Sequence, residues 1–188
     1  MGSKNKLDKI VVVDLEATCW MPREEQGDQR SDIIEIGACF LDLQTGKISQ
    51  KTSYIVRPAS STISKFCTDL TTLTQKDVNF GIPFRDACNK FAKEFGTKNR
   101  IWASWGDYDR KHFERDCEFY NAKYPFGPRH LNAKTLFSLV NGLNKEVGLA
   151  RALEYYDMDF KGTHHRGHDD AFNIAKVLWK TLRKNYTP

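Results

Sequence analysis

Three apolar runs near the start of the chain constrain its fold more than any other feature. The first, residues 9–13 (KIVVV), is rich in β-branched side chains and stops at Asp14. Such a run is typical of a buried strand. The second and third runs, residues 33–43 and 49–56, are separated by residues 44–47 (QTGK), whose glycine suits a tight turn. The sequence therefore predicts that the chain opens with three strands in a meander.

Helical patterns dominate the rest of the chain. Residues 83–96 carry apolar side chains at helical spacing, with Pro83 at the start and Gly96 at the end. Residues 100–105 (RIWASW) form a further expected strand, and residues 58–82 hold short helices at most. Other helices are expected at 108–122, 132–142, 147–156 and from about 169 onward. This order predicts an α/β fold, a mixed sheet flanked by helices.

Length and composition indicate one globular domain over residues 1–188, with its core at about 9–184. Apolar residues make up 40% of the chain and charged residues 28%, which excludes disordered and coiled-coil classes. The formal net charge of +5 is compatible with a polyanionic partner, although an ordinary solvated surface explains it equally well. Nothing in the sequence demands more than a monomer.

The cysteines and the apolar runs indicate the cellular compartment in which the protein is expected. The five cysteines are widely spaced and include no C-x-x-C pair, a poor pattern for disulfides or for zinc. No stretch approaches the roughly 20 apolar residues of a membrane span. We therefore expect a cytoplasmic protein without a membrane partner.

Two carboxylates end the first strand, at Asp14 and Glu16. Side chains alternate along a strand, so positions i and i+2 project from one face, with Cα atoms ~6.5 Å apart. Two carboxylates this close repel each other unless a cation neutralises them, and such oxygen ligands suit Mg²⁺ or Mn²⁺. The alternative is a solvent-exposed strand end with two unrelated acids, since the tripeptide D-x-E is common.

A second acidic pair, Asp107 and Asp109, follows the strand expected at residues 100–105. An aspartate at a strand-to-helix boundary either faces the end of the sheet or caps the helix. Capping is the more ordinary role for Asp107. Phe113, four residues beyond Asp109, is expected to face the core, which makes Asp109 the candidate metal ligand.

The third signal lies in residues 163–170 (THHRGHDD), before the last helix. His165 and Asp170 are five residues apart, about 140° around a helix, so they would not share a helix face. They meet if His165 stands in the preceding loop and Asp170 in the first turn, with Asp169 as the N-cap. Zinc binding by the three histidines of this segment is an alternative, but it lacks a further ligand nearby.

Together the three segments place four carboxylates and one histidine at the boundaries of expected elements. Four carboxylates suit two divalent cations ~4 Å apart, which activate water and stabilise the leaving oxygen in phosphodiester hydrolysis. A histidine, whose ordinary pKa lies near neutrality, is suited to accept the proton of that water. We assign this role to His165.

These motifs resemble the DEDDh branch of the 3′–5′ exonuclease superfamily, and within it the ERI-like exoribonucleases. The resemblance spans residues 9–184 and rests on residues 14–19 (DLEATC), 105–113 (WGDYDRKHF) and 165–175 (HRGHDDAFNIA). Residues 33–37 (IIEIG) and 66–75 (FCTDLTTLTQ) also resemble the family's second strand and the segment that follows its meander.

The resemblance implies a ribonuclease-H-like fold and stepwise release of nucleoside 5′-monophosphates from a 3′ end. It implies two Mg²⁺ or Mn²⁺ ions, and His165 as the general base. It also implies four metal ligands: Asp14, Glu16, Asp109 and Asp170. Asp107 is the alternative to Asp109 as a metal ligand, and His164 is the alternative to His165 as the general base. Spacing favours Asp109 and His165. Thr72 stands where relatives commonly have glycine.

Substrate contacts are expected from the residues that follow the first acids and from one tryptophan near the second pair. These residues are Leu15, Ala17, Thr18, Trp20 and Trp105. A tryptophan that stacks on a base contributes about 1–3 kcal/mol to binding whatever the sequence. Packing in the core is the competing role for each tryptophan.

The leading hypothesis is a metal-dependent 3′–5′ exonuclease that acts on single-stranded RNA, with DNA as a further substrate. The preference for RNA comes from the subfamily resemblance alone, because the sequence does not identify a residue that reads a 2′-hydroxyl. The alternative is a regulatory or nucleic-acid-binding protein that uses the same fold with little catalysis. A ribonuclease-H-like endonuclease is a third class, and it predicts internal cuts.

Overall fold

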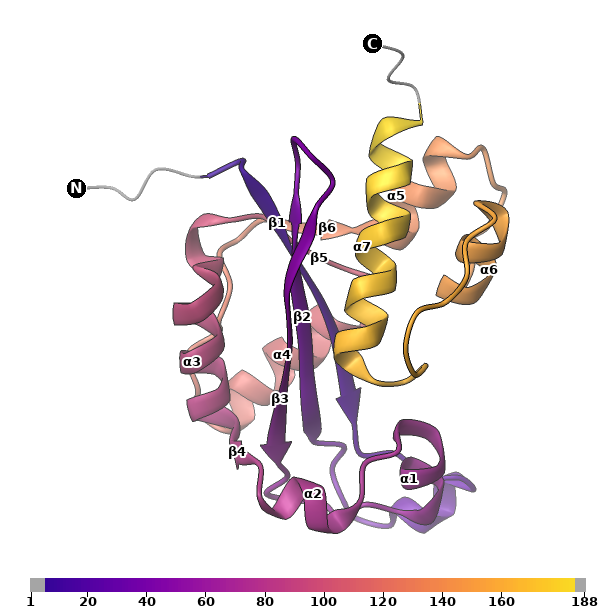
Figure 1. The fold of residues 1–188 in the computed structure, drawn as a ribbon. Helices are drawn as coiled ribbons and strands as arrows, with labels where there is room; N and C mark the ends of the chain where they lie inside the picture. The colour runs from indigo at the N-terminus through magenta and orange to yellow at the C-terminus, as the bar shows by residue number, and fades with distance from the viewer. Residues whose placement is uncertain (1–5, 185–188) are drawn as a thin grey trace, which may run out of the picture.

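The computed structural model describes residues 6–184, which form a six-stranded mixed sheet (Figure 1). The strand order is β4-β3-β2-β1-β5-β6. Strands β1, β2 and β3 form the expected antiparallel meander, β5 runs parallel to β1, and β6 runs parallel to β5. The strands are β1 (Lys9–Ala17), β2 (Ile33–Asp42), β3 (Ile48–Arg57), β4 (Ile82–Pro83), β5 (Trp102–Ser104) and β6 (His130–Asn132).

Seven α-helices accompany the sheet in the described part of the chain, and Figure 1 shows α3 and α5–α7 on opposite sides of it. Two short 3-10 helices, η1 (Arg23–Gln26) and η2 (Thr97–Asn99), complete the described elements. The α-helices are α1 (Lys65–Thr71), α2 (Gln75–Asn79), α3 (Phe84–Phe95), α4 (Tyr108–Phe119), α5 (Ala133–Val140), α6 (Leu149–Tyr155) and α7 (Gly167–Arg183).

Alternation along β1 separates two hydrophobic cores. Val11 and Val13 pack in one core with aromatic residues of α3 and α4, whereas Ile10 and Val12 pack in the other with α5, α6 and α7. Residues 14 and 16 are an even number of positions from Ile10 and Val12, so their side chains point to the same face of the strand. The first two carboxylates therefore project from the α7 face of the sheet.

The expected elements are present, with differences at several of their ends and two short strands that were not predicted. Strand β1 continues to Ala17 instead of ending at residue 13, because β2 pairs with it as far as Ala17 opposite Ile33. The strands β4 and β6 were not predicted, since two and three residues are too few to show an alternating pattern. Helix α7 begins at Gly167.

The expectation that Asp169 caps α7 is wrong. Arg166 occupies the N-cap, and Asp169 lies in the first turn of the helix. The carboxylate of Asp169 instead accepts a hydrogen bond from the Thr163 N–H, at 2.8 Å, and pairs with Lys51. It therefore binds the loop before the helix rather than the helix end.

A residue in the left-handed backbone conformation follows each of two helices. Gly96 follows α3 with φ 56°, a conformation that glycine adopts without steric cost. Thr72 follows α1 with φ 65°, which explains why glycine suits this position. Of residues 6–184, no helix combines the length and apolar character needed to cross a bilayer.

Candidate active site

Three carboxylates from two elements converge where β1 meets the start of α7. Asp14 and Glu16 project from β1, and Asp170 from the first turn of α7. One oxygen from each lies within 4.8 Å of the others. A strand end and a helix start, more than 150 positions apart in sequence, thus form one acidic group.

Asp109, not Asp107, lies beside this group. Asp109 is buried at the start of α4, and its Oδ1 accepts a hydrogen bond from the Leu15 N–H, at 2.9 Å. Asp107 occupies the N-cap of α4 without a capping hydrogen bond, and its carboxylate is 3.4 Å from Arg110 Nε and 3.6 Å from His130 Nδ1. The structure thus places Asp109, and not Asp107, in the cavity that the carboxylates of β1 and α7 line.

Two histidines border the carboxylates from the loop before α7. His164 Nε2 lies 3.5 Å from Asp170 Oδ1, and the rings of His164 and His165 stack with centroids 4.0 Å apart. His165 has φ 61°, an uncommon conformation for a residue with a side chain. As the spacing predicted, the histidine stands in the loop and Asp170 in the helix. Both histidines reach the site, so the choice between them is a matter of mechanism.

The carboxylates and the two histidines line one cavity of about 320 Å³. Leu15 and Trp105, two of the predicted substrate contacts, lie in its wall, and the Trp105 indole N–H donates to the Val147 carbonyl at 3.1 Å. The sequence did not single out Tyr108 and Leu149. The full lining is Asp14, Leu15, Glu16, Trp105, Tyr108, Asp109, Leu149, His164, His165 and Asp170.

The other predicted substrate contacts, Ala17, Thr18 and Trp20, are outside that lining. Ala17 is buried, and Trp20 is partly exposed in the segment after β1. The Thr18 hydroxyl accepts a hydrogen bond from the Asp32 N–H, at 2.8 Å, and so shapes the loop that returns to β2. Their roles in substrate binding stay predictions.

Burial and mutual repulsion raise the pKa values of the carboxylates in this cavity. Burial, followed by the neighbouring carboxylates, raises the pKa of Asp14 well above its usual range and that of Glu16 to about 9. Burial is also the main cause that raises the pKa of Asp109 to about 6 and that of Asp170 to about 7. Perturbation of this kind in a cavity is typical of functional sites.

The carboxylates fit a divalent cation. Asp170 Oδ2 is buried and has no hydrogen-bond partner among residues 6–184, although buried carboxylate oxygens normally have one. A hard cation supplies such a partner and also offsets the repulsion that raises the pKa values. The acidic group is therefore a candidate divalent-metal site.

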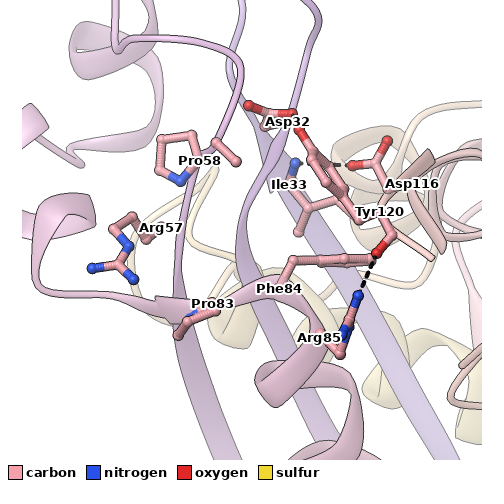
Figure 2. A pocket seen from close by; sticks show the side chains of 10 residues that line it. Asp32, Ile33, Arg57, Pro58, Pro83, Phe84, Arg85, Asp116 and Tyr120 are labelled. Atoms are coloured by element: carbon pink, nitrogen blue, oxygen red, sulfur yellow. Dashed lines mark hydrogen bonds between the residues drawn. The ribbon is translucent and has the colours of Figure 1, made fainter. Parts of the chain in front are cut away.

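A second cavity, of about 270 Å³, lies where β2, β3, β4, α3 and α4 meet (Figure 2). Ile33 and Phe84, in its wall, belong to the core on the α3 and α4 side of the sheet. Asp116 accepts a hydrogen bond from the Ile33 N–H, at 3.3 Å, and Arg85 donates to the Tyr120 carbonyl, at 3.2 Å. This cavity contains none of the predicted site residues.

A mixed sheet whose first strand and last helix present carboxylates to one cavity defines a ribonuclease-H-like nuclease fold. The family model described as Exonuclease (RNase_T) matches residues 11–178. The chain belongs to this exonuclease family.

Known proteins and structures resemble this chain along nearly all of its length. Human ERI1 exoribonuclease 2 is 29% identical over 205 residues, which cover 96% of this chain and 29% of that protein. Human 3′-5′ exoribonuclease 1 is 30% identical, covering 94% of this chain and 53% of that protein. This chain therefore spans about a third to a half of the length of these two relatives.

A solved structure described as the nuclease domain of 3′hExo, a DEDDh family member, bound to rAMP is also similar. It has a TM-score of 0.85 and 28% sequence identity, and the match covers 97% of this chain and 95% of that one. The similarity therefore extends over nearly all of that solved nuclease domain.

Proposed function

We propose that this chain is a metal-dependent 3′–5′ exonuclease that hydrolyses single-stranded RNA to nucleoside 5′-monophosphates. The observation that carries the proposal is the convergence of Asp14, Glu16 and Asp170 in a cavity that Asp109 and two histidines also line. Membership of the exonuclease family and the relatives named exoribonucleases support it. DNA is a second candidate substrate.

We assign Asp14, Glu16, Asp109 and Asp170 to the binding of two Mg²⁺ or Mn²⁺ ions. When bound, such ions polarise the phosphoryl group, lower the pKa of a water molecule and stabilise the leaving oxygen. Asp109 also accepts the Leu15 N–H bond, so its orientation is fixed relative to the two carboxylates of β1.

His165 is assigned to accept the proton of the attacking water. Burial and the neighbouring His164 lower the pKa of His165, so at neutral pH the ring is uncharged and able to take a proton. His164 lies 3.5 Å from Asp170 and is the competing base. The partly buried position of His165 shields it from bulk water, whereas the side chain of His164 is 50% exposed.

Leu15 and Trp105 are assigned to the terminal nucleotide. Both line the cavity, and the hydrogen bond from the Trp105 indole to Val147 fixes one edge of its ring. A fixed aromatic wall can stack on a base of any identity. We therefore expect shortening of the RNA with little dependence on base sequence.

The test is incubation of the protein with 5′-labelled single-stranded RNA and DNA, with Mg²⁺, Mn²⁺ or a chelator. We expect a ladder that shortens from the 3′ end, depends on the metal and is strongly slowed in His165→Ala but less in His164→Ala. Internal cuts would favour an endonuclease. Binding of the strands without cleavage in any metal would contradict the proposal and favour a regulatory role.

A further inference from the structure

Glu35 is a fully buried carboxylate that the proposed chemistry leaves without a role. It lies in β2, and in the β1–β2 ladder it stands opposite Glu16. Its side chain is 0% exposed. A carboxylate removed from water is unfavourable unless hydrogen-bond donors compensate for the lost hydration. The donors around Glu35 therefore show which part of the chain its carboxylate binds.

Four donors saturate the two oxygens of Glu35. Oε1 accepts from Ser53 Oγ at 2.6 Å and contacts His168 Nδ1 at 3.0 Å, while Oε2 accepts from Arg166 Nε at 3.1 Å and from the Gly167 N–H at 3.2 Å. These donors lower the pKa of Glu35 despite its burial. Three of the four belong to consecutive residues at the start of α7, so Glu35 binds that segment.

The start of α7 depends on β2 for its position. Arg166, the N-cap residue, gives the helix no side-chain capping bond among the described residues, so the carboxylate of Glu35 takes the Gly167 N–H from outside the helix. Two residues further along β2, Gly37 lies so close that a Cβ there would be 1.8 Å from the Gly167 carbonyl carbon. Glu35 and Gly37 together hold the helix start against the sheet.

His165 immediately precedes this segment. Its φ of 61° is a conformation that persists in a residue with a side chain only when the surroundings impose it. On one side, the Thr163 N–H is bound by the Asp169 carboxylate, and on the other, Glu35 binds the three residues that follow His165. The backbone conformation of His165 is therefore fixed by bonds to its neighbours, and its ring stacks on that of His164.

We propose that Glu35 is a positioning residue for His165: its bonds to residues 166–168 hold the loop so that the imidazole faces the carboxylate cavity. This inference rests on the proposed exonuclease function. Glu35 itself does not line the cavity, and protein donors bind both of its oxygens.

The test is Glu35→Gln, which keeps the size of the side chain but turns one acceptor oxygen into a donor facing other donors. We expect kcat on 5′-labelled RNA to fall about tenfold or more, with KM changed by less than about threefold. In a His165→Ala background the same substitution should lower kcat by less than about twofold, because the residue that it positions is gone. Equal losses in both backgrounds would overturn the proposal.

Two further variants separate positioning from stability. Ser53→Ala removes a donor on the β3 side of Glu35 and leaves the loop bonds in place, so kcat should stay within about twofold of the wild type. Arg166→Ala removes one loop bond and leaves the buried carboxylate with three donors. We expect a smaller loss of kcat from it, also suppressed by His165→Ala, and this variant replaces Glu35→Gln if the latter does not fold by circular dichroism.

The outcomes distinguish this inference from the proposed function. A wild-type protein without metal-dependent 3′–5′ hydrolysis would contradict the proposed function, and the role of Glu35 with it. An active wild type combined with unchanged kcat in folded Glu35→Gln and Arg166→Ala would overturn the role of Glu35 alone.

Discussion

At the scale of residues, Asp107 and Asp109 show how two aspartates on one short segment differ. Asp109 is 4% exposed, accepts the Leu15 N–H and has a pKa raised to about 6, chiefly by burial. The side chain of Asp107 is 43% exposed and lies near Arg110 and His130. Only Asp109 combines proximity to β1 with an environment that favours cation binding.

We predict that Asp109→Asn lowers the rate of RNA hydrolysis by about 100-fold or more, because one metal ligand is lost. Asp107→Asn is the matched control two positions away, and it should change the rate by less than about threefold. Single-turnover hydrolysis of labelled RNA at saturating Mg²⁺ measures both. A larger loss in Asp107→Asn than in Asp109→Asn would contradict the assignment.

At the scale of elements, the site depends on the crossing of β2 and α7. Gly37 on β2 meets Gly167 at the helix start, and a Cβ at residue 167 would lie 2.9 Å from the Asp14 carbonyl oxygen. The absence of side chains lets the helix start approach both strands. That approach brings Asp170 within reach of the carboxylates of β1.

We predict that Gly37→Ala destabilises the protein by about 1–3 kcal/mol, because the added methyl group separates α7 from β2. Gly148→Ala is the control: Gly148 has φ −66° and nothing within 4 Å of a Cβ, so a change below about 1 kcal/mol is expected. Urea unfolding measures both. Equal stability of the two variants would contradict the importance of the crossing.

The sequence predicted those parts of the fold and site that have a local pattern. The helical spacing up to Gly96 and the apolar runs of the meander located α3 and strands β1–β3. Short strands such as β6 have no such pattern, because pairing with β5 alone defines them. The sequence also did not predict the role of Glu35. This residue lies within an apolar run, and its donors Arg166 and Gly167 come from the other end of the chain, so no local pattern indicates the interaction.

At the scale of the whole molecule, folding brings like charges together. The pKa values of Asp14, Glu16 and Asp170 are raised because burial and mutual repulsion disfavour their ionised forms. Such a group favours the native state below its pKa in the unfolded chain, and that advantage is lost as the pH rises through its folded pKa. The acidic site therefore costs stability at neutral and alkaline pH unless a cation is bound.

We predict that Glu16→Gln is more stable than the metal-free wild type, and that the difference grows from pH 7 to pH 9, because the pKa of Glu16 is about 9. Comparing the two proteins cancels the groups that titrate independently of Glu16. Saturating Mg²⁺ should reverse the order, since only the wild type retains the full ligand set. Thermal unfolding measures this, and a difference independent of pH would contradict the account.

The central claim, that distant carboxylates form one divalent-metal site, is tested most directly by calorimetric titration of Mn²⁺ into the protein at pH 7.5. We predict saturable binding with release of protons in the wild type, because the metal displaces the protons that the raised pKa values retain. Asp14→Asn should lose most of this binding while keeping its circular dichroism spectrum. No binding to the wild type, or undiminished binding to Asp14→Asn, would contradict the claim.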